Sequence, residues 1–291
     1  HALPVEALQP LLASWAPRAD LEPLLPLLAH CAPVEAPQEV RGFHRYAKLA
    51  VAVDFVRATA AAPSPEAVLT ALERFAEAER TWLKVAGGDK AAVLEAYARA
   101  RCLRPGEAAV EYGCFLGYTS VRLARLQLPP FGPGPEQGPP GAPGSQWPGP
   151  VVSFELDAVH VCCALHLVDL ARARHVAEVW PGHVPWLTPR LVEDFGAGAL
   201  GLGFMDHRGT RFHLDADDLL RLQLVACGAQ VLADNALNPG APLLLWGPAR
   251  CGAAGAAFMP WQAARWALLE HGRPFEDWMV AQNHCGQAAA G

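Results

Sequence analysis

The chain has 291 residues, of which 52% are hydrophobic and 18% charged, and its 23 Lys and Arg against 29 Asp and Glu give a formal net charge of -6. This composition is typical of a soluble globular domain and excludes collagen-like, coiled-coil and wholly disordered chains. The negative charge argues against a nucleic-acid partner, because phosphate binding needs clustered Lys and Arg.

Targeting signals and cysteine usage give two further expectations. No uncharged stretch is long and proline-free enough to span a membrane, so no transmembrane segment is predicted. The eight cysteines are irregularly spaced without a C-x-x-C motif, which favours reduced, mostly buried thiols and a cytoplasmic location. The chain starts at His1 rather than Met, so we expect an upstream segment to have been removed.

The first 63 residues contain eight prolines and are predicted to form short helical pieces, an N-terminal extension to a main domain over 64–291. Ser64 is a candidate N-cap with Pro65 at the first helical position. Apolar residues then recur at helical spacing: Val68, Leu69, Leu72, Phe75 and Ala76. A second helix is predicted over about 89–101.

A strand, a tight turn and a helix are predicted over residues 107–126. Ala108–Tyr112 is a short apolar run, Gly113 and Gly117 suit a turn, and a helical pattern follows to Leu126. Residues 129–150 contain 15 Pro or Gly in 22 positions, which predicts a mobile surface insertion with little capacity for a core.

Further buried strands are predicted downstream, separated by helices near 158–171 and 215–224. Their approximate ranges are 151–156, 176–180, 200–205 and 229–233. Strands that alternate with helices indicate an α/β fold with a doubly wound, mostly parallel sheet.

Polar residues follow several of these strands. Ligands of such sheets bind at the carboxyl ends of the strands, near the point where strand order reverses. Glu155 ends one strand and could accept hydrogen bonds from a ribose, or be a solvated strand-end charge. Asp206 follows the predicted strand 200–205, and Asp234 and Asn235 follow the predicted strand 229–233. These oxygens suit Mg²⁺, although Asp at a strand end also commonly caps a helix.

The motifs at these strand ends resemble the catechol O-methyltransferase family, which depends on S-adenosylmethionine and Mg²⁺. They are VEYGCFLGYTSVRLAR, FEL, FMDH and VLADNALNPGAP, preceded by SPEAVLTALERF and TWLKVAGGDK. The resemblance runs from about Val51 to Trp278 and extends to a transmembrane O-methyltransferase-like branch. It implies a Rossmann-like class I methyltransferase fold.

The resemblance also implies roles for individual residues. Those expected to contact the cofactor are Val85, Gly113, Phe115, Tyr118, Thr119, Glu155 and His207. Those expected to bind the metal are Asp206, Asp234 and Asn235, and those expected to border the acceptor are Trp82, Arg208 and Pro239. Glu276 is a candidate for the family's acidic residue that contacts the second catechol hydroxyl.

The chain departs from the family pattern at the catalytic base. Two positions after His207 the family has a lysine, whereas this chain has Gly209 and no lysine downstream of Lys90. Lys84, His207 and His183 are the candidate replacements for the base. Arg208 stays protonated and is a poor base, but it could pair with an anionic acceptor.

Three functions remain open from the sequence. The first is a Mg²⁺-assisted O-methyltransferase for a small catechol or phenol, slower than its relatives because general-base help supplies about 10²–10⁴-fold. The second is a catalytically degenerate methyltransferase domain that serves as a binding or scaffold module. The third, a nicotinamide-dependent oxidoreductase, is disfavoured because the G-x-G-x-x-G spacing is absent. No zinc-hydrolase motif is present, and the oligomeric state cannot be predicted.

Overall fold

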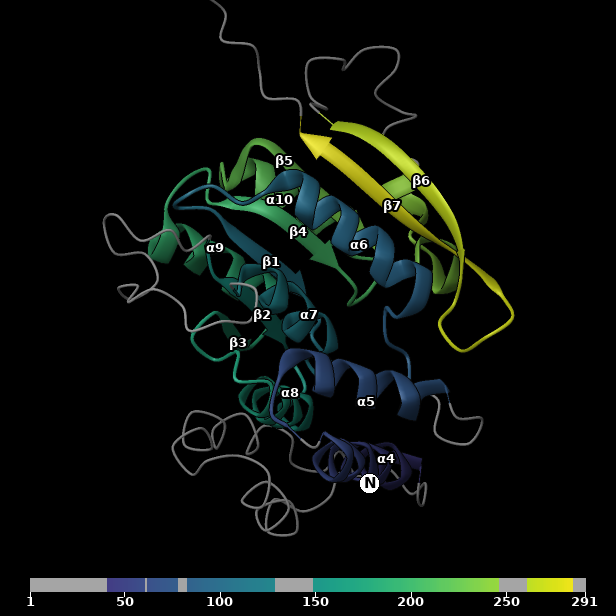
Figure 1. Ribbon diagram of the computed structural model, residues 1–291. Coiled ribbons are helices and arrows are strands. Elements are labelled where there is room, and N and C mark those ends of the chain that lie inside the picture. The colour runs from purple at the N-terminus through teal and green to yellow at the C-terminus, as the bar shows by residue number, and fades with distance from the viewer. Residues whose placement is uncertain (1–40, 61, 78–82, 129–148, 246–260, 285–291) are drawn as a thin grey trace, which may run out of the picture.

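The computed structural model describes residues 41–60, 62–77, 83–128, 149–245 and 261–284. They contain a seven-stranded sheet with helices on both faces (Figure 1). The strands are β1 Ala108–Tyr112, β2 Val151–Glu155, β3 Ala177–Pro181, β4 Leu200–Met205, β5 Val225–Ala233, β6 Trp261–Leu269 and β7 Glu276–His284. Their order is β3-β2-β1-β4-β5-β7-β6. The first five strands pair in parallel, which confirms the doubly wound sheet.

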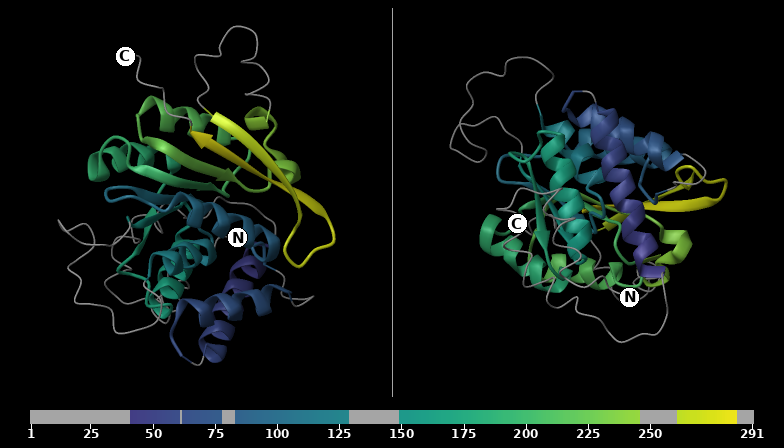
Figure 2. Two further views of the ribbon diagram at one scale, coloured as in Figure 1. Left: turned by 45° about the horizontal axis from the view of Figure 1, so that its top comes forward. Right: turned by 90° about the horizontal axis from the view of Figure 1, so that it is seen from below.

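The helices bury two apolar cores, one on each face of the sheet. The right-hand view of Figure 2 shows the purple and blue helices on one side of the sheet and green helices on the other. The helices are α4 Arg41–Thr59, α5 Pro65–Glu77, α6 Gly88–Arg101, α7 Tyr118–Gln127, α8 Ala158–Leu170, α9 Val184–Phe195 and α10 Phe212–Arg221. The strand order reverses between β1 and β4, so a ligand site is expected at their carboxyl ends.

The N-terminal part of the described chain differs from the predicted short pieces. Residues 41–59 form the single helix α4, because this stretch contains no proline. Its buried residues lie at helical spacing and join the core formed with α5 and α8: Leu49, Ala52, Val53 and Val56. Residues 1–40 lie outside the described part.

The predicted start of α5 is confirmed. The Ala67 N–H donates to Ser64 Oγ at 3.2 Å, and Pro65 is the first helical residue. This side-chain cap satisfies one of the backbone donors that a helix leaves unpaired at its start.

The C-terminal strands were not predicted from the sequence. β7 pairs antiparallel with β5 and with β6, which forms the edge of the sheet. β5 is also four residues longer than predicted, with Gly228 at a φ of 75° inside it and a register shift against β4. β6 lies beside α6, and β7 lies beside β5.

Two other expectations concern the cysteines and the insertion. Five cysteines lie in the described residues and all are free thiols: Cys102, Cys114, Cys162, Cys163 and Cys227. Three of these are buried and two exposed. The predicted mobile insertion lies, except for residues 149–150, outside the described part. Within the described residues, no helix is long and apolar enough to cross a membrane.

Candidate functional site

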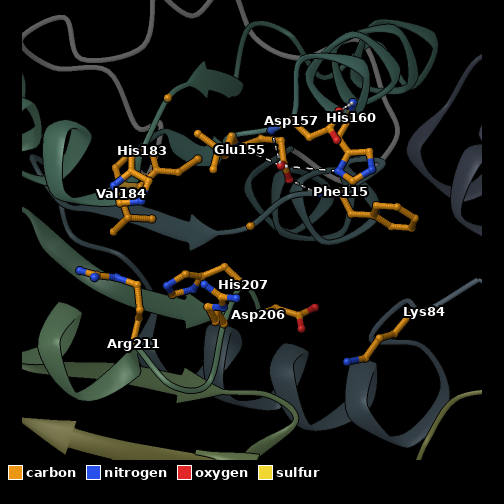
Figure 3. Close-up of a pocket in the computed structure, with 15 residues that line it drawn as sticks. Lys84, Phe115, Glu155, Asp157, His160, His183, Val184, Asp206, His207 and Arg211 are labelled. Atoms are coloured by element: carbon orange, nitrogen blue, oxygen red, sulfur yellow. Dashed lines mark hydrogen bonds and ion pairs between the residues drawn. The ribbon is translucent and has the colours of Figure 1, made fainter. Parts of the chain in front are cut away.

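A cavity of about 740 Å³ opens at the carboxyl ends of β1, β2 and β4, where the strand order reverses. Figure 3 shows Glu155 and Phe115 on one wall, Asp206 and His207 facing them, and the Lys84 side chain at one end. The cavity thus lies where a parallel sheet of this order binds its ligands.

The structure brings seven of the sequence-predicted site residues to this cavity. They are Lys84, Gly113, Phe115, Glu155, Asp206, His207 and Arg208, and His183 lies there as well. Other predicted residues lie elsewhere: Val85, Tyr118 and Thr119 are buried behind the wall, and Asp234 and Asn235 follow β5. Pro239 and Glu276 are exposed outside the cavity lining, and Trp82 lies outside the described residues.

The buried Tyr118 has a structural set of partners. Its hydroxyl donates to Glu73 Oε1 at 2.6 Å, and the Arg122 guanidinium lies 4.8 Å from its ring centroid. Tyr118 therefore links α7 to α5 and supports the cavity wall from behind.

The glycine turn after β1 is shaped by close backbone approach. Gly113 has a φ of 90°, and a Cβ there would lie 2.8 Å from His207 Cβ and 2.9 Å from His207 Cα. Gly117 has a φ of 79°, and a Cβ there would lie 3.1 Å from Ala164 Cα. Both positions require glycine, as the sequence predicted for this turn.

Glu155 organises the wall opposite Asp206. Its Oε2 accepts the Phe115 N–H at 2.9 Å, and its Oε1 accepts the N–H groups of Leu156 and Asp157 at 2.9 Å. Oε1 also lies 3.5 Å from His160 Nδ1, so its acceptor positions are occupied. Oε2 accepts one bond from the described residues and can accept one further donor from the cavity.

His207 is held by a partner that the sequence did not reveal. Its Nε2 lies 2.8 Å from Oδ2 of Asp215, a buried residue of α10. The imidazole also packs against Tyr112 and Phe212, with ring centroids 5.8 and 5.2 Å apart. Its Nδ1 is buried and has no hydrogen-bond partner in the described structure. Asp215 lies within a predicted helix, and nothing in the sequence indicated that it would contact His207.

Asp206 and Asp234 lie at the ends of the neighbouring strands β4 and β5. Burial raises the pKa of Asp206 well above its usual value, and the charge of Asp234 raises it further. Burial also raises the pKa of Asp234, to about 6, although the Lys90 ammonium opposes this. The two carboxylates are therefore close enough to repel each other.

Lys90 forms a buried ionic cluster beside these carboxylates. Its Nζ lies 2.8 Å from Asp234 Oδ1, 2.7 Å from Glu270 Oε2 and 3.0 Å from Asp277 Oδ2. Burial alone would lower the pKa of Lys90, but Asp234 and Glu270 raise it above its usual value. Lysine in the first turn of a helix is usually solvated, so the sequence gave no indication of this cluster.

Three oxygen groups at this edge of the sheet have no hydrogen-bond donor among the described residues. The carboxylate of Asp206, Oδ2 of Asp234 and Oδ1 of Asn235 accept no hydrogen bond from the described residues. No three or more His, Cys, Asp or Glu side chains are grouped to hold a metal in the described chain. The predicted set has only two such side chains, since its third member is an amide.

Gly209, which stands where a family lysine was expected, is enclosed by the backbone. A Cβ at Gly209 would lie 2.3 Å from the Gly240 carbonyl oxygen and 3.3 Å from Ala241 Cβ. Gly240 ends the short π-type turn Ala236–Gly240 that follows Asn235. The lysine could not be restored at this position without moving that turn.

Glu111 on β1 carries a buried carboxyl group behind the cavity. Its Oε2 accepts hydrogen bonds from Ser120 Oγ and Ser153 Oγ, both at 2.6 Å. Burial raises the pKa of Glu111 to about 7, despite the opposing effect of these hydrogen bonds. The folded protein therefore favours the protonated carboxyl group at mildly acidic pH.

Glu111→Gln is expected to flatten the pH dependence of stability. The folded pKa of Glu111 is raised, so its protonated form contributes full stability below about pH 4.5 and loses it as the pH rises through about 7. The loss is about 3 kcal/mol, at 1.36 kcal/mol per pKa unit. Urea unfolding of both proteins at several pH values measures the difference, and parallel profiles would contradict the assignment.

Relatives of this chain are O-methyltransferases. No family model matches the sequence. Mouse catechol O-methyltransferase is 27% identical over 178 residues, which are 61% of this chain and 59% of the mouse protein. The "Probable O-methyltransferase" of Mycobacterium tuberculosis is 30% identical over 199 residues, 66% of this chain and 75% of that protein. The match thus spans less than two thirds of the mammalian relative.

Solved structures share the fold. The O-methyltransferase TomG from Streptomyces achromogenes, in complex with S-adenosylmethionine, has a TM-score of 0.53 at 21% identity, covering 70% of this chain and 82% of that one. The O-methyltransferase from Bacillus cereus, in complex with S-adenosylhomocysteine, has a TM-score of 0.52 at 15% identity, covering 94% and 99%. These structures bear out the Rossmann-like architecture expected from the sequence.

Proposed function

The chain belongs to the O-methyltransferase family that includes the catechol O-methyltransferases, and from this premise we propose that it methylates a hydroxyl group of a small catechol or phenol. The methyl donor is S-adenosylmethionine, with assistance from Mg²⁺. The observation that carries the proposal is the carboxylate of Asp206 in the cavity, which accepts no hydrogen bond from the described residues, with Lys84 at one end of the cavity and Glu155 on the opposite wall (Figure 3).

The cofactor is proposed to lie along the wall formed by β1, β2 and β4. Gly113 leaves space beside His207, and the free acceptor position of Glu155 suits a ribose hydroxyl. The sulfonium of S-adenosylmethionine supplies the methyl group, which is transferred in line from sulfur to the acceptor oxygen. The cavity walls align the two partners, and such alignment supplies a large part of the acceleration.

The unpaired oxygens of Asp206, Asp234 and Asn235 are proposed to hold Mg²⁺. Two carboxylates and an amide oxygen match the hard-ligand preference of this ion, and the mutual repulsion of the carboxylates favours a cation between them. Bound Mg²⁺ would lower the pKa of the acceptor hydroxyl. The fit rests on the donor set and its free oxygens.

Lys84 is the proposed base in place of the lysine absent at Gly209. It lines the cavity, and the charge of its protonated form lowers the pKa of Asp206, which supports a position near that carboxylate. As a base it would act in the neutral amine form. His207 is less suited because Asp215 occupies its Nε2. Arg208 is exposed at the cavity and could pair with an anionic acceptor.

A degenerate binding or scaffold domain is the second candidate. The close packing of Gly209 against Gly240 supports it, because the Gly240 backbone occupies the space that a lysine side chain at position 209 would need. The oxygens that accept no hydrogen bond from the described residues favour the enzyme instead, because a scaffold has no need to leave one oxygen of the buried Asp234 and the carboxylate of Asp206 without a donor.

The deciding experiment is a calorimetric titration of the full chain with S-adenosylmethionine, with and without Mg²⁺, followed by addition of catechol and mass detection of the methylated product. Binding together with Mg²⁺-dependent methylation is expected. Binding without product in the presence of both catechol and a carboxylated catechol would favour the scaffold. No binding at millimolar cofactor would overturn the enzyme proposal.

A further inference from the structure

The Lys90 cluster draws its members from three separate parts of the chain. Lys90 lies in the first turn of α6, Glu270 follows β6 and Asp277 lies on β7. The lysine ammonium and both carboxylates have side chains that are at most 2% exposed. Since one ammonium meets three carboxylates, the cluster keeps an excess of negative charge beside the unpaired oxygens of the site.

The cluster fixes the orientation of the Asn235 side chain. Asn235 Nδ2 donates to Asp277 Oδ2 at 2.5 Å and to Glu270 Oε2 at 3.2 Å. An ionised carboxylate can only accept, so the NH₂ group must face the cluster and Oδ1 must point away from it.

The cluster also selects one oxygen of Asp234. Asp234 Oδ1 receives the Lys90 ammonium at 2.8 Å and the Asn235 N–H at 2.7 Å. Oδ2 receives no bond from the described residues. The same cluster therefore leaves one oxygen free on each of two consecutive residues.

Asp277 ties the following turn to β7 through its other oxygen. Asp277 Oδ1 accepts the N–H groups of Leu237 at 3.2 Å, Asn238 at 3.0 Å and Trp278 at 2.7 Å. Three backbone donors bind Oδ1, whereas Oδ2 binds the Asn235 amide and the Lys90 ammonium, so the orientation of the Asp277 carboxylate is fixed.

We propose that Lys90 and Asp277 are positioning residues which orient Asp234 Oδ2 and Asn235 Oδ1 toward the metal site. This inference rests on the proposed function, because it assumes that these oxygens bind Mg²⁺. It adds that β7 and α6, outside the cavity, determine the metal affinity of a site built on β4 and β5. Outer partners of metal ligands contribute about 10–100-fold to affinity.

Asp277→Asn is the sharpest test. Its amide oxygen must stay on the three backbone N–H groups, so the new NH₂ group faces the Asn235 NH₂ group. Two donors cannot pair, and rotation of the Asn235 amide relieves the conflict by turning its oxygen away from the metal. We expect the affinity for Mn²⁺, measured by electron paramagnetic resonance with the full chain, to fall about 10–100-fold. The affinity for S-adenosylmethionine should stay unchanged.

Lys90→Met provides a second variant, which removes the ammonium and should weaken Mn²⁺ binding at least as much. If Lys90→Met does not fold, Asp277→Asn decides alone. Asp277→Asn is expected to fold because it removes one of three carboxylates that share a single ammonium. Asp194→Asn is the matched control, since Asp194 forms only a solvent-exposed pair with Arg190. In turnover, the apparent Mg²⁺ constant of Asp277→Asn should rise while KM for the methyl donor stays constant.

The outcomes separate this inference from the proposed function. Wild-type protein that binds Mn²⁺, with equal affinity in Asp277→Asn, would overturn the positioning role alone. Wild-type protein that binds S-adenosylmethionine but no Mn²⁺ would overturn the metal assistance and the positioning role with it. Equal loss of cofactor and Mn²⁺ binding in Asp277→Asn would indicate general disruption and would also overturn the inference.

Discussion

Gly209→Lys is expected to destabilise the protein by about 3 kcal/mol rather than restore a catalytic base. The first side-chain atom would lie 2.3 Å from the Gly240 carbonyl oxygen, a backbone atom that no change of rotamer can move. Overpacking of this kind costs about 1–3 kcal/mol when side chains can adjust, and the upper end applies to a backbone contact. Urea unfolding of the variant and the wild type measures the difference.

Two variants show whether the cause is steric. Gly209→Ala adds only the clashing atom and should reproduce most of the loss. Thr210→Lys places the same charge at the neighbouring exposed position and should change stability by less than about 0.5 kcal/mol. A Gly209→Lys protein that is as stable as the wild type and more active would show that the turn can move and that the absent lysine limits the reaction.

The strands that border the cavity could be predicted because their sequences fit few structures other than a buried strand. Ala108–Tyr112 and Leu200–Met205 are short apolar runs between turn residues, and the structure places both strands as expected. Burial on both faces of a parallel sheet imposes this pattern. The rule that ligands bind at strand ends then located Glu155 and Asp206.

The C-terminal part of the sheet could not be predicted in this way. The run WQAARWALL in β6 consists mostly of Ala, Leu, Arg and Gln, which have high helix propensity. It becomes a strand because it pairs with β7, which itself pairs with β5. Tertiary pairing therefore overrides local preference here, and the sequence carries no local signal of it.

The Lys90 cluster was missed for a related reason. Lys90 and its partners Glu270 and Asp277 are 180 and 187 residues apart in sequence. No spacing rule connects positions at such distances, and a lysine at the start of a helix is ordinarily exposed. The predicted oxygens of Asp234 and Asn235 could be named from their motif, whereas their orientation depends on this cluster.

Asp206→Asn is expected to abolish Mg²⁺-dependent methylation while leaving the protein at least as stable as the wild type. The ionised carboxylate is disfavoured by burial and by Asp234, so a neutral amide of the same shape removes an unfavourable charge. The same change removes one of two carboxylates proposed to bind Mg²⁺, and metal assistance contributes several kcal/mol to such reactions. Thermal melting, Mn²⁺ binding and product formation are measured on one preparation.

Comparing Lys84→Met with Asp206→Asn distinguishes the effect of losing the base on turnover from the effect of losing the bound metal. Removing a general base lowers kcat by about 10²–10⁴-fold, but Lys84 donates no oxygen to the proposed metal site, so Mn²⁺ binding should persist. Asp206→Asn should lose both Mn²⁺ binding and turnover, because without the cation the acceptor hydroxyl keeps its proton whether or not Lys84 is present. Methylation by Asp206→Asn at the wild-type rate would contradict the metal role of this strand end. Full turnover by Lys84→Met would show that another group removes the acceptor's proton, and His183 and His207 are the other candidates that line the cavity.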